Sequence, residues 1–275
     1  MDLSHVLWIG GGQGSGKSSI AWALSRRFDL QLYAIDHRVW VHEPRMPESE
    51  FRGLSMDKRW VDATPQRMLD WFLTTSRHWF RLVLEDLKEL SESPLVVVEG
   101  PQLLPTTVSA VLRQADQALF LISDLDEQRK RLLARGPILG TSDGLRARAN
   151  ATERDLMITQ RYLREAADLR LAVLEVDRPL DEMLELAVEQ LRPAIERGPR
   201  AADLAAVRRF ENDVLATQVR LYRESLGADK PEEGPLQFAC ECGASRCEVV
   251  VELPLADYEA LSAGGDKSPL RRPRP

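Results

Sequence analysis

A glycine-rich loop near the start of the chain carries the strongest chemical pattern in the sequence. Residues 11–18 read GGQGSGKS and match G-x-x-x-x-G-K-S/T at every fixed position. Glycines at these places let the backbone turn tightly, so that successive amide groups point towards phosphate oxygens. An apolar run precedes the loop, and a helical pattern follows it, which adds the partial positive charge of a helix N-terminus. The spacing therefore predicts a site for the phosphates of a nucleoside triphosphate.

Each residue type in this loop has an expected contribution to such a site. The side chain of Lys17 reaches the β- and γ-phosphates, and the hydroxyl group of Ser18 ligates Mg²⁺. Contacts with the nucleotide are expected from Gly11, Gly12, Gln13, Gly14, Ser15, Gly16, Lys17, Ser18 and Ser19. The pattern identifies a loop that binds a triphosphate, but it does not show what happens to the γ-phosphate.

Two acidic residues follow predicted strands. Asp36 ends the run LQLYAID (30–36), and Glu99 follows three valines within 94–100. Ligands of open α/β sheets bind at the carboxyl ends of the strands, so both side chains are expected near the loop. Asp36 is placed to accept the proton of an attacking hydroxyl group, with a helix cap or a solvated turn as the alternative. Glu99 is placed to hold water on the magnesium ion, and it is the next candidate for the base.

A group of arginines follows the fourth predicted strand. Arg131 and Arg135 are four residues apart, which predicts that they share one face of a helix over 124–136. The next segment, 137–153, is rich in glycine, serine and threonine and has the composition of a mobile loop. Three more arginines lie in or just after it, namely Arg146, Arg148 and Arg154. Guanidinium groups can neutralise a transferring phosphoryl group, and the alternative is a solvated charged face.

All three cysteines lie close together, at Cys240, Cys242 and Cys247. Three thiolates can ligate Zn²⁺, but a structural zinc site normally closes with four ligands. No histidine follows His78, so the fourth ligand would come from water, from an acid such as Glu241 or from a partner chain. The alternative is a set of three reduced cysteines in a hairpin turn.

Five apolar segments alternate with helical patterns and predict the framework that positions these residues. Such an alternation is typical of a parallel sheet with helices on both faces, joined by right-handed crossovers. The predicted strands are 6–11, 30–36, 94–100, 117–123 and 169–177. We expect this α/β unit to occupy residues 1–195.

The composition changes after the α/β unit. A short linker precedes a helix predicted over 202–226, which either docks on the core or forms the seam of a homodimer. Two short strands follow around the cysteines, so a small helix and β-hairpin module is expected over 196–262. The tail, 263–275, is expected to be disordered.

The charge balance and the hydropathy exclude several classes of protein. The chain has 275 residues, with 37 Lys and Arg against 43 Asp and Glu, and its net charge of −6 argues against a general nucleic-acid binder. No apolar run approaches the roughly 18 residues that a membrane span needs. The N-terminus lacks the pattern of a signal peptide, and three clustered cysteines predict no disulfide framework. A reducing cytoplasm is therefore the expected compartment.

Together these segments resemble the P-loop kinase group that includes nucleoside, nucleotide, gluconate, shikimate and chloramphenicol phosphotransferases. The resemblance covers about residues 5–191 and rests on GGGQGSGKSS, YAID, VVVEG and DEQRKRLLARG, followed by a loop and LEVD. The N-K-x-D motif of a regulatory GTPase does not occur, and neither does the hydrophobic run ending in a D-E pair that a motor ATPase would have. The resemblance implies a three-layer P-loop NTPase sandwich with a five-stranded parallel sheet. It also implies transfer of the γ-phosphate of ATP to a hydroxyl group of a small molecule.

The same resemblance implies roles for three segments. Residues 136–154 would form a lid over ATP, residues 177–181 would pass near the adenine, and residues 37–93 would cover the acceptor. The last segment carries aromatic rings that can stack on a flat ligand and cations that can hold an anion. These residues are Trp40, Trp60, Trp71, Trp79, Arg38, Arg45, Arg52 and Arg59. For Trp71 and Trp79 the alternative is packing within a helix core.

The sequence does not identify the acceptor. One alternative is a regulatory or adaptor protein that binds ATP without an acceptor, and in which the nucleotide alters the contacts of the C-terminal module. The segment FACECGASRCEVVVELPLADYEAL also resembles a short module of uncharacterised actinobacterial proteins, a likeness that implies no mechanism.

Overall fold

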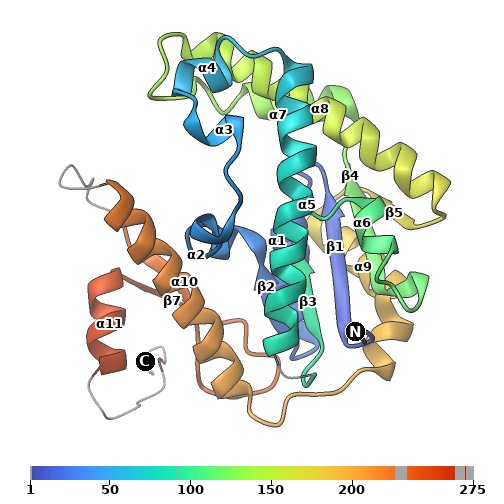
Figure 1. Cartoon of the computed structure of the whole chain (residues 1–275). Helices are drawn as coiled ribbons and strands as arrows, with labels where there is room; N and C mark the ends of the chain where they lie inside the picture. Colours follow the sequence, from blue (N-terminus) through green and yellow to red (C-terminus); the bar gives the residue numbers. More distant parts are fainter. Residues whose placement is uncertain (1, 91, 227–233, 264–269, 271–275) are drawn as a thin grey trace.

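Five parallel strands form the centre of the structure, a computed structural model that describes residues 2–90, 92–226, 234–263 and 270. The strands lie in the order β2-β3-β1-β4-β5, which confirms the predicted α/β class (Figure 1). Their bounds are β1 Val6–Gly11, β2 Gln31–Ala34, β3 Val96–Glu99, β4 Ala118–Ile122 and β5 Ala172–Glu175. The tail predicted over 263–275 lies outside the described residues, except for residues 263 and 270.

The apolar runs of the central strands are continuous because helices cover both faces of the sheet. Trp8, Val98 and Phe120 point into one core layer, where they pack against α5 and α8. Neighbouring residues such as Leu7 and Ile9 point into the other layer, against α1 and α9. This alternation follows from the period of two in a β-strand. The sheet is thus the middle of three layers (Figure 1).

Helices alternate with the strands as the sequence predicts, but part of the segment 137–153, expected to be a mobile loop, is helical. The main helices are α1 Lys17–Arg27, α5 Pro65–Glu89, α6 Pro105–Ser109, α7 Leu125–Leu133, α8 Gly144–Asp168, α9 Leu180–Arg197, α10 Leu204–Leu226 and α11 Leu255–Ala263. Residues 37–63, which lack a clear period, fold into short turns: η1 Ile35–Arg38, α2 Val39–His42, η2 Glu43–Arg45, α3 Glu50–Gly53 and α4 Met56–Trp60. A further short turn, η3 Ala115–Gln117, precedes β4. The segment 137–153 is only partly irregular, because Asp143 caps α8 by accepting a hydrogen bond from the backbone N–H of Arg146.

The predicted C-terminal helix and hairpin are both present. Strands β6 Leu236–Ala239 and β7 Val250–Leu253 pair in antiparallel fashion and pack with α11 against α10. The rings of Phe238 and Tyr258 stack at 4.2 Å between centroids in a small core of their own. No helix among the described residues combines the length and the apolar character that a membrane crossing requires.

Helix α10 docks on the outer edge of β2 through a buried group of charges. Glu211 accepts a hydrogen bond from the backbone N–H of Leu32 at 2.7 Å, so that its carboxylate satisfies a donor of the edge strand. The same carboxylate pairs with Arg26 at 2.9 Å and with Arg208 at 2.8 Å. Arg208 also donates to the carbonyl oxygens of Leu30 and Ser25. Of the two roles predicted for this helix, docking on the core is the one present in the structure.

We predict that Glu211→Ala destabilises the protein by about 3–5 kcal/mol, because it leaves two buried guanidinium groups without a carboxylate. The side chains of Arg26, Arg208 and Glu211 are each less than a tenth exposed. Urea unfolding checks this expectation, with Glu185→Ala as the control, since Glu185 pairs with Arg27 on the surface. Equal midpoints for the two variants would contradict a stabilising role of the buried group.

Candidate active site

The loop between β1 and α1 has the backbone shape that the glycine pattern predicts. Gly14 and Gly16 have φ angles of +75° and +83°, in the left-handed region that favours glycine. Gly12 has no room for a side chain, because a Cβ atom there would lie 2.3 Å from Oγ1 of Thr159. From α7, Gln128 donates a hydrogen bond to the carbonyl oxygen of Gln13 at 2.9 Å. The loop is therefore held in place by the two helices that follow β4.

Lys17 begins α1 and is buried beneath the loop. Its Nζ atom donates a hydrogen bond to the carbonyl oxygen of Gly12 at 2.7 Å. Burial lowers the pKa of the Lys17 ammonium group, while the negative charges of Glu99, Asp36 and Asp155 act in the opposite direction. A cation held in this way beside a phosphate-sized loop is suited to bind the oxygens of a triphosphate.

Glu99 reaches the loop because of the register of the sheet. It pairs with Ile9 of β1 on one side and with Ala34 of β2 on the other. The hydroxyl group of Ser18 donates to its carboxylate at 3.2 Å. Burial raises the pKa of Glu99 to about 6, against the opposing charge of Lys17. A hydroxyl and a carboxylate oxygen side by side fit Mg²⁺, which prefers oxygen ligands and keeps several of its waters.

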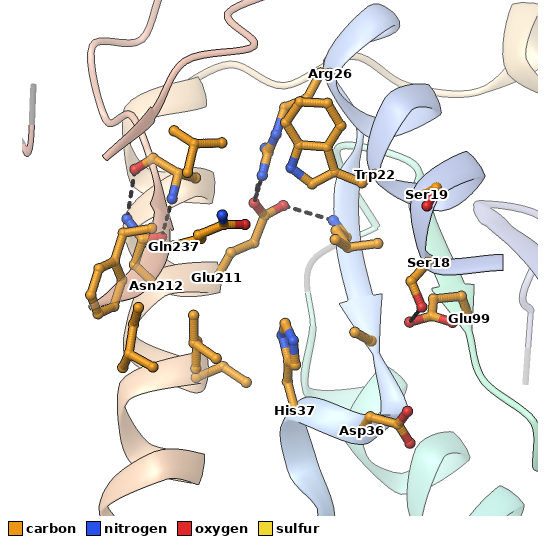
Figure 2. A pocket seen from close by; sticks show the side chains of 18 of the residues that line it. Ser18, Ser19, Trp22, Arg26, Asp36, His37, Glu99, Glu211, Asn212 and Gln237 are labelled. Carbon is orange, nitrogen blue, oxygen red and sulfur yellow. Dashed lines mark hydrogen bonds and ion pairs between the residues drawn. The ribbon is translucent and has the colours of Figure 1, made fainter. Parts of the chain in front are cut away.

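Asp36 lies just beyond the end of β2, in the short turn η1, with its carboxylate exposed. It caps no helix, and within the described part of the chain no hydrogen bond or ion pair engages it. Figure 2 shows Asp36 on the same side of the sheet as Ser18 and Glu99. Its neighbour His37 also lines the cavity there, and burial lowers the pKa of that imidazole.

The arginines divide into two groups. Arg135 lies at the loop, with its Nη2 atom 3.3 Å from the place that a Cβ atom of Gly14 would occupy. It lines a cavity of about 230 Å³ together with Gln13, Arg148 and Arg154. Arg131 instead lies 3.9 Å from a carboxylate oxygen of Asp177.

The shared helix face predicted for Arg131 and Arg135 is wrong. Helix α7 ends at Leu133, so Arg135 follows the helix and turns back towards the loop. Arg146, in the first turn of α8, is exposed. Three of the five predicted arginines are thus brought to the loop, and Arg131 and Arg146 are not among them.

A larger cavity, of about 740 Å³, opens beside Ser18, Asp36 and Glu99 (Figure 2). One wall consists of α1 and the end of β2, and the opposite wall consists of α10 and the C-terminal hairpin. The walls carry apolar side chains from both units, namely Trp22, Leu32, Phe210, Val214, Leu215, Leu236, Phe238 and Val250. The sequence pattern does not predict this second wall. The one signal for it in the sequence is the apolar stripe of the helix predicted over 202–226.

The tryptophans of the insertion 37–93 have different surroundings. Trp79 is buried in the main core, as its helical spacing predicts. Trp71 is half-buried and contacts the ring of Phe51, and Trp40 contacts Tyr222 of α10. Trp60 lies under the guanidinium group of Arg154, beside the smaller cavity. Among these rings, only Trp60 lines one of the two cavities described above.

The three cysteines meet at one end of the C-terminal hairpin. Their Sγ atoms all lie within 4.8 Å of one another. Cys240 is buried, Cys242 and Cys247 are half-buried, and no disulfide joins any of them.

A scan against protein-family models finds no match, and a search of curated proteins finds none either. Among solved structures, TT1252 from Thermus thermophilus is 25% identical over 68% of this chain and 96% of its own, with a TM-score of 0.40. A gluconokinase from Sinorhizobium meliloti is 17% identical over 71% and 96%, with a TM-score of 0.38. Shikimate kinase from Acinetobacter baumannii in complex with shikimate is 13% identical over 70% and 93%, with a TM-score of 0.39. At such TM-scores, the assignment of an activity rests on the site itself.

We predict that Glu99→Gln stabilises the ligand-free protein by about 2 kcal/mol above pH 7, because a raised pKa means that ionisation opposes folding. Ionisation of Glu99 costs no folding free energy below pH 4.5, the pKa of the side chain in the unfolded chain. The cost is complete above about pH 6, its pKa in the folded protein. The gain should therefore shrink when urea unfolding is measured at pH 5 instead of pH 8. An equal gain at both pH values would contradict the burial of an ionised carboxylate, and Glu175→Gln, on an exposed strand end, is the control.

Proposed function

We propose that the protein is an ATP-dependent phosphotransferase that moves the γ-phosphate of ATP to a hydroxyl group of a small molecule. The observation that carries this proposal is the convergence of Lys17, the Ser18–Glu99 pair and Asp36 at one edge of the sheet, beside a cavity. A loop that only binds a nucleotide has no need of an unpaired carboxylate next to such a cavity. Its volume of about 740 Å³ is within the usual range for small-molecule sites.

The nucleotide is held by the loop and by the groups around it. Backbone amides of residues 12–16 and the ammonium group of Lys17 bind the phosphate oxygens. The Ser18 hydroxyl and, through water, the Glu99 carboxylate would hold Mg²⁺, which when bound neutralises charge on the β- and γ-phosphates. Arg135 and Arg148 supply further positive charge beside Gln13, where the γ-phosphate is expected, while Arg154 in the same cavity pairs with Asp155.

Asp36 acts as the general base in this proposal. It accepts the proton of the acceptor hydroxyl group while the hydroxyl oxygen forms a bond to the γ-phosphorus. The bond from that phosphorus to the bridging oxygen breaks in line, and ADP leaves with the electron pair. An exposed carboxylate without a partner is suited to this step, because no ion pair has to break before it accepts the proton.

The lining of the larger cavity favours an uncharged, largely apolar acceptor. Its walls are mainly aliphatic and aromatic, and its two arginines are already paired. Arg26 pairs with Glu211, and Arg38 pairs with Asp86. An acceptor carboxylate would have to compete with these buried partners, whereas an alcohol needs only a base at one end and apolar contacts along its length.

We expect Asp36→Asn to lower the rate of transfer by about 100- to 10,000-fold, because an amide cannot accept the proton. The assay measures ADP and the phosphorylated product by mass spectrometry over a panel of neutral apolar alcohols and carboxylated polyols. ATP affinity, measured by calorimetry, should stay unchanged in this variant and should be lost in Lys17→Ala. The control is Asp70→Asn, an exposed carboxylate on α5. ATP binding without transfer to any compound would instead support the regulatory alternative.

We also expect Val214→Trp to lower kcat/KM for the acceptor by about 10- to 100-fold, because the larger side chain fills the cavity from α10. ATP affinity should not change, since α10 lies on the far wall from the loop (Figure 2). The matched control is Ala206→Trp, at an exposed position of the same helix that does not line the cavity. If both variants turned over the acceptor normally, the acceptor would have to bind elsewhere.

A further inference from the structure

We propose that Cys240, Cys242 and Cys247 together bind one Zn²⁺ ion, a site that is separate from the phosphate loop and does not depend on the proposed activity. The three Sγ atoms lie within 4.8 Å of one another. Thiolates around a tetrahedral zinc ion, at about 2.3 Å from the metal, lie about 3.8 Å apart. The cluster therefore needs to contract only by about 1 Å to match that geometry.

A tight turn follows the first two cysteines. Gly243 follows Cys242 with a φ angle of +72°, which a side chain would strain. The turn that it makes directs the backbone N–H of Ala244 at Sγ of Cys242, at 3.4 Å. A hydrogen bond donated to sulfur stabilises its charged form, and the thiolate is the form that ligates a metal. The turn thus fixes the position of one sulfur of the cluster.

An odd number of thiols in one cluster is better explained by a metal than by redox chemistry. These are the only cysteines of the chain, and none of them forms a disulfide. One disulfide would leave the third sulfur without a partner, whereas a soft divalent cation takes all three. Each thiol releases its proton to solvent when it binds the ion.

The fourth position of the ion stays open to solvent or to an added ligand. Glu241 lies between two of the cysteines, but its carboxylate is held by Arg209 and Asn212 on α10. Within the described ranges, no other Cys, His, Asp or Glu brings a ligand atom into the cluster. We therefore expect three sulfur ligands and one exchangeable ligand.

The position of the cluster gives the ion a structural role. Asp29, after α1, accepts hydrogen bonds from the Ser245 hydroxyl and from the backbone N–H of Arg246, both in the loop between the cysteines. At the other end of the cluster, Cys240 directly follows Ala239, which lines the larger cavity. A bound ion would fasten this loop to the core and would fix the hairpin wall of that cavity.

Titration of the reduced full-length chain with Co²⁺ tests the site without any assay of activity. We expect one ion per chain, thiolate-to-metal charge-transfer absorption and the visible bands of a tetrahedral ion, all displaced by Zn²⁺. Zn²⁺ should also protect all three thiols from a thiol reagent. Cys247→Ser should weaken binding by roughly 100-fold or more, whereas Glu248→Gln, an exposed neighbour, should not.

Two results would overturn the site. One is an octahedral Co²⁺ spectrum without charge transfer, and the other is equal reactivity of the three thiols with and without Zn²⁺. Both are measured on the unaltered protein, so a variant that fails to fold does not decide the outcome. Circular dichroism of Cys247→Ser shows whether a loss of binding reflects a loss of structure.

Discussion

The register of three neighbouring parallel strands is the constraint on which the candidate site depends. Glu99 stands opposite Ile9 and Ala34, so the carboxyl ends of β1, β2 and β3 finish at one level. Because these ends are level, the phosphate loop, the Glu99 carboxylate and the turn with Asp36 lie close together. A slip of one residue in β3 would turn the Glu99 side chain to the opposite face of the sheet and would put a valine side chain in its position. Helices on both faces oppose such a slip, because every residue of β1 and β3 is buried.

Two buried groups of charges, around Glu211 and around Lys17, differ in how well they are compensated. Around Glu211 both carboxylate oxygens accept hydrogen bonds, and both arginines have partners. Around Lys17 the ammonium group has one hydrogen bond, to a carbonyl oxygen, and burial raises the pKa of the nearby Glu99. Incomplete compensation is common where a ligand supplies the missing charge. The first group holds the fold together, and the second is suited to receive anionic oxygens and a metal ion.

Local patterns were sufficient to predict the sheet, the loop and the side on which Glu99 and Asp36 lie. Each depends on a short run of residues, such as three valines before an acid or glycines before a lysine. The position of Arg131 depends on where α7 ends, and a period of four residues does not determine that end. The second wall of the cavity comes from α10, which docks on α1 and β2 from far along the chain. Such long-range packing depends on a pair like Arg26 and Glu211, which no local pattern reveals.

The docking of α10 also links specificity to stability. Arg208 and Glu211 fix the helix to the edge of β2, while Phe210 and Val214, on the adjacent face, line the cavity. A shift of the helix would change the shape of the cavity, but it would leave the phosphate loop intact, because α7 and α8 hold that loop from the other side. The choice of acceptor can therefore vary with α10 and the hairpin without loss of the machinery that binds the triphosphate. The edge strand β2 therefore has two functions. It carries Asp36 at its end, and it holds the docking site for α10 along its side.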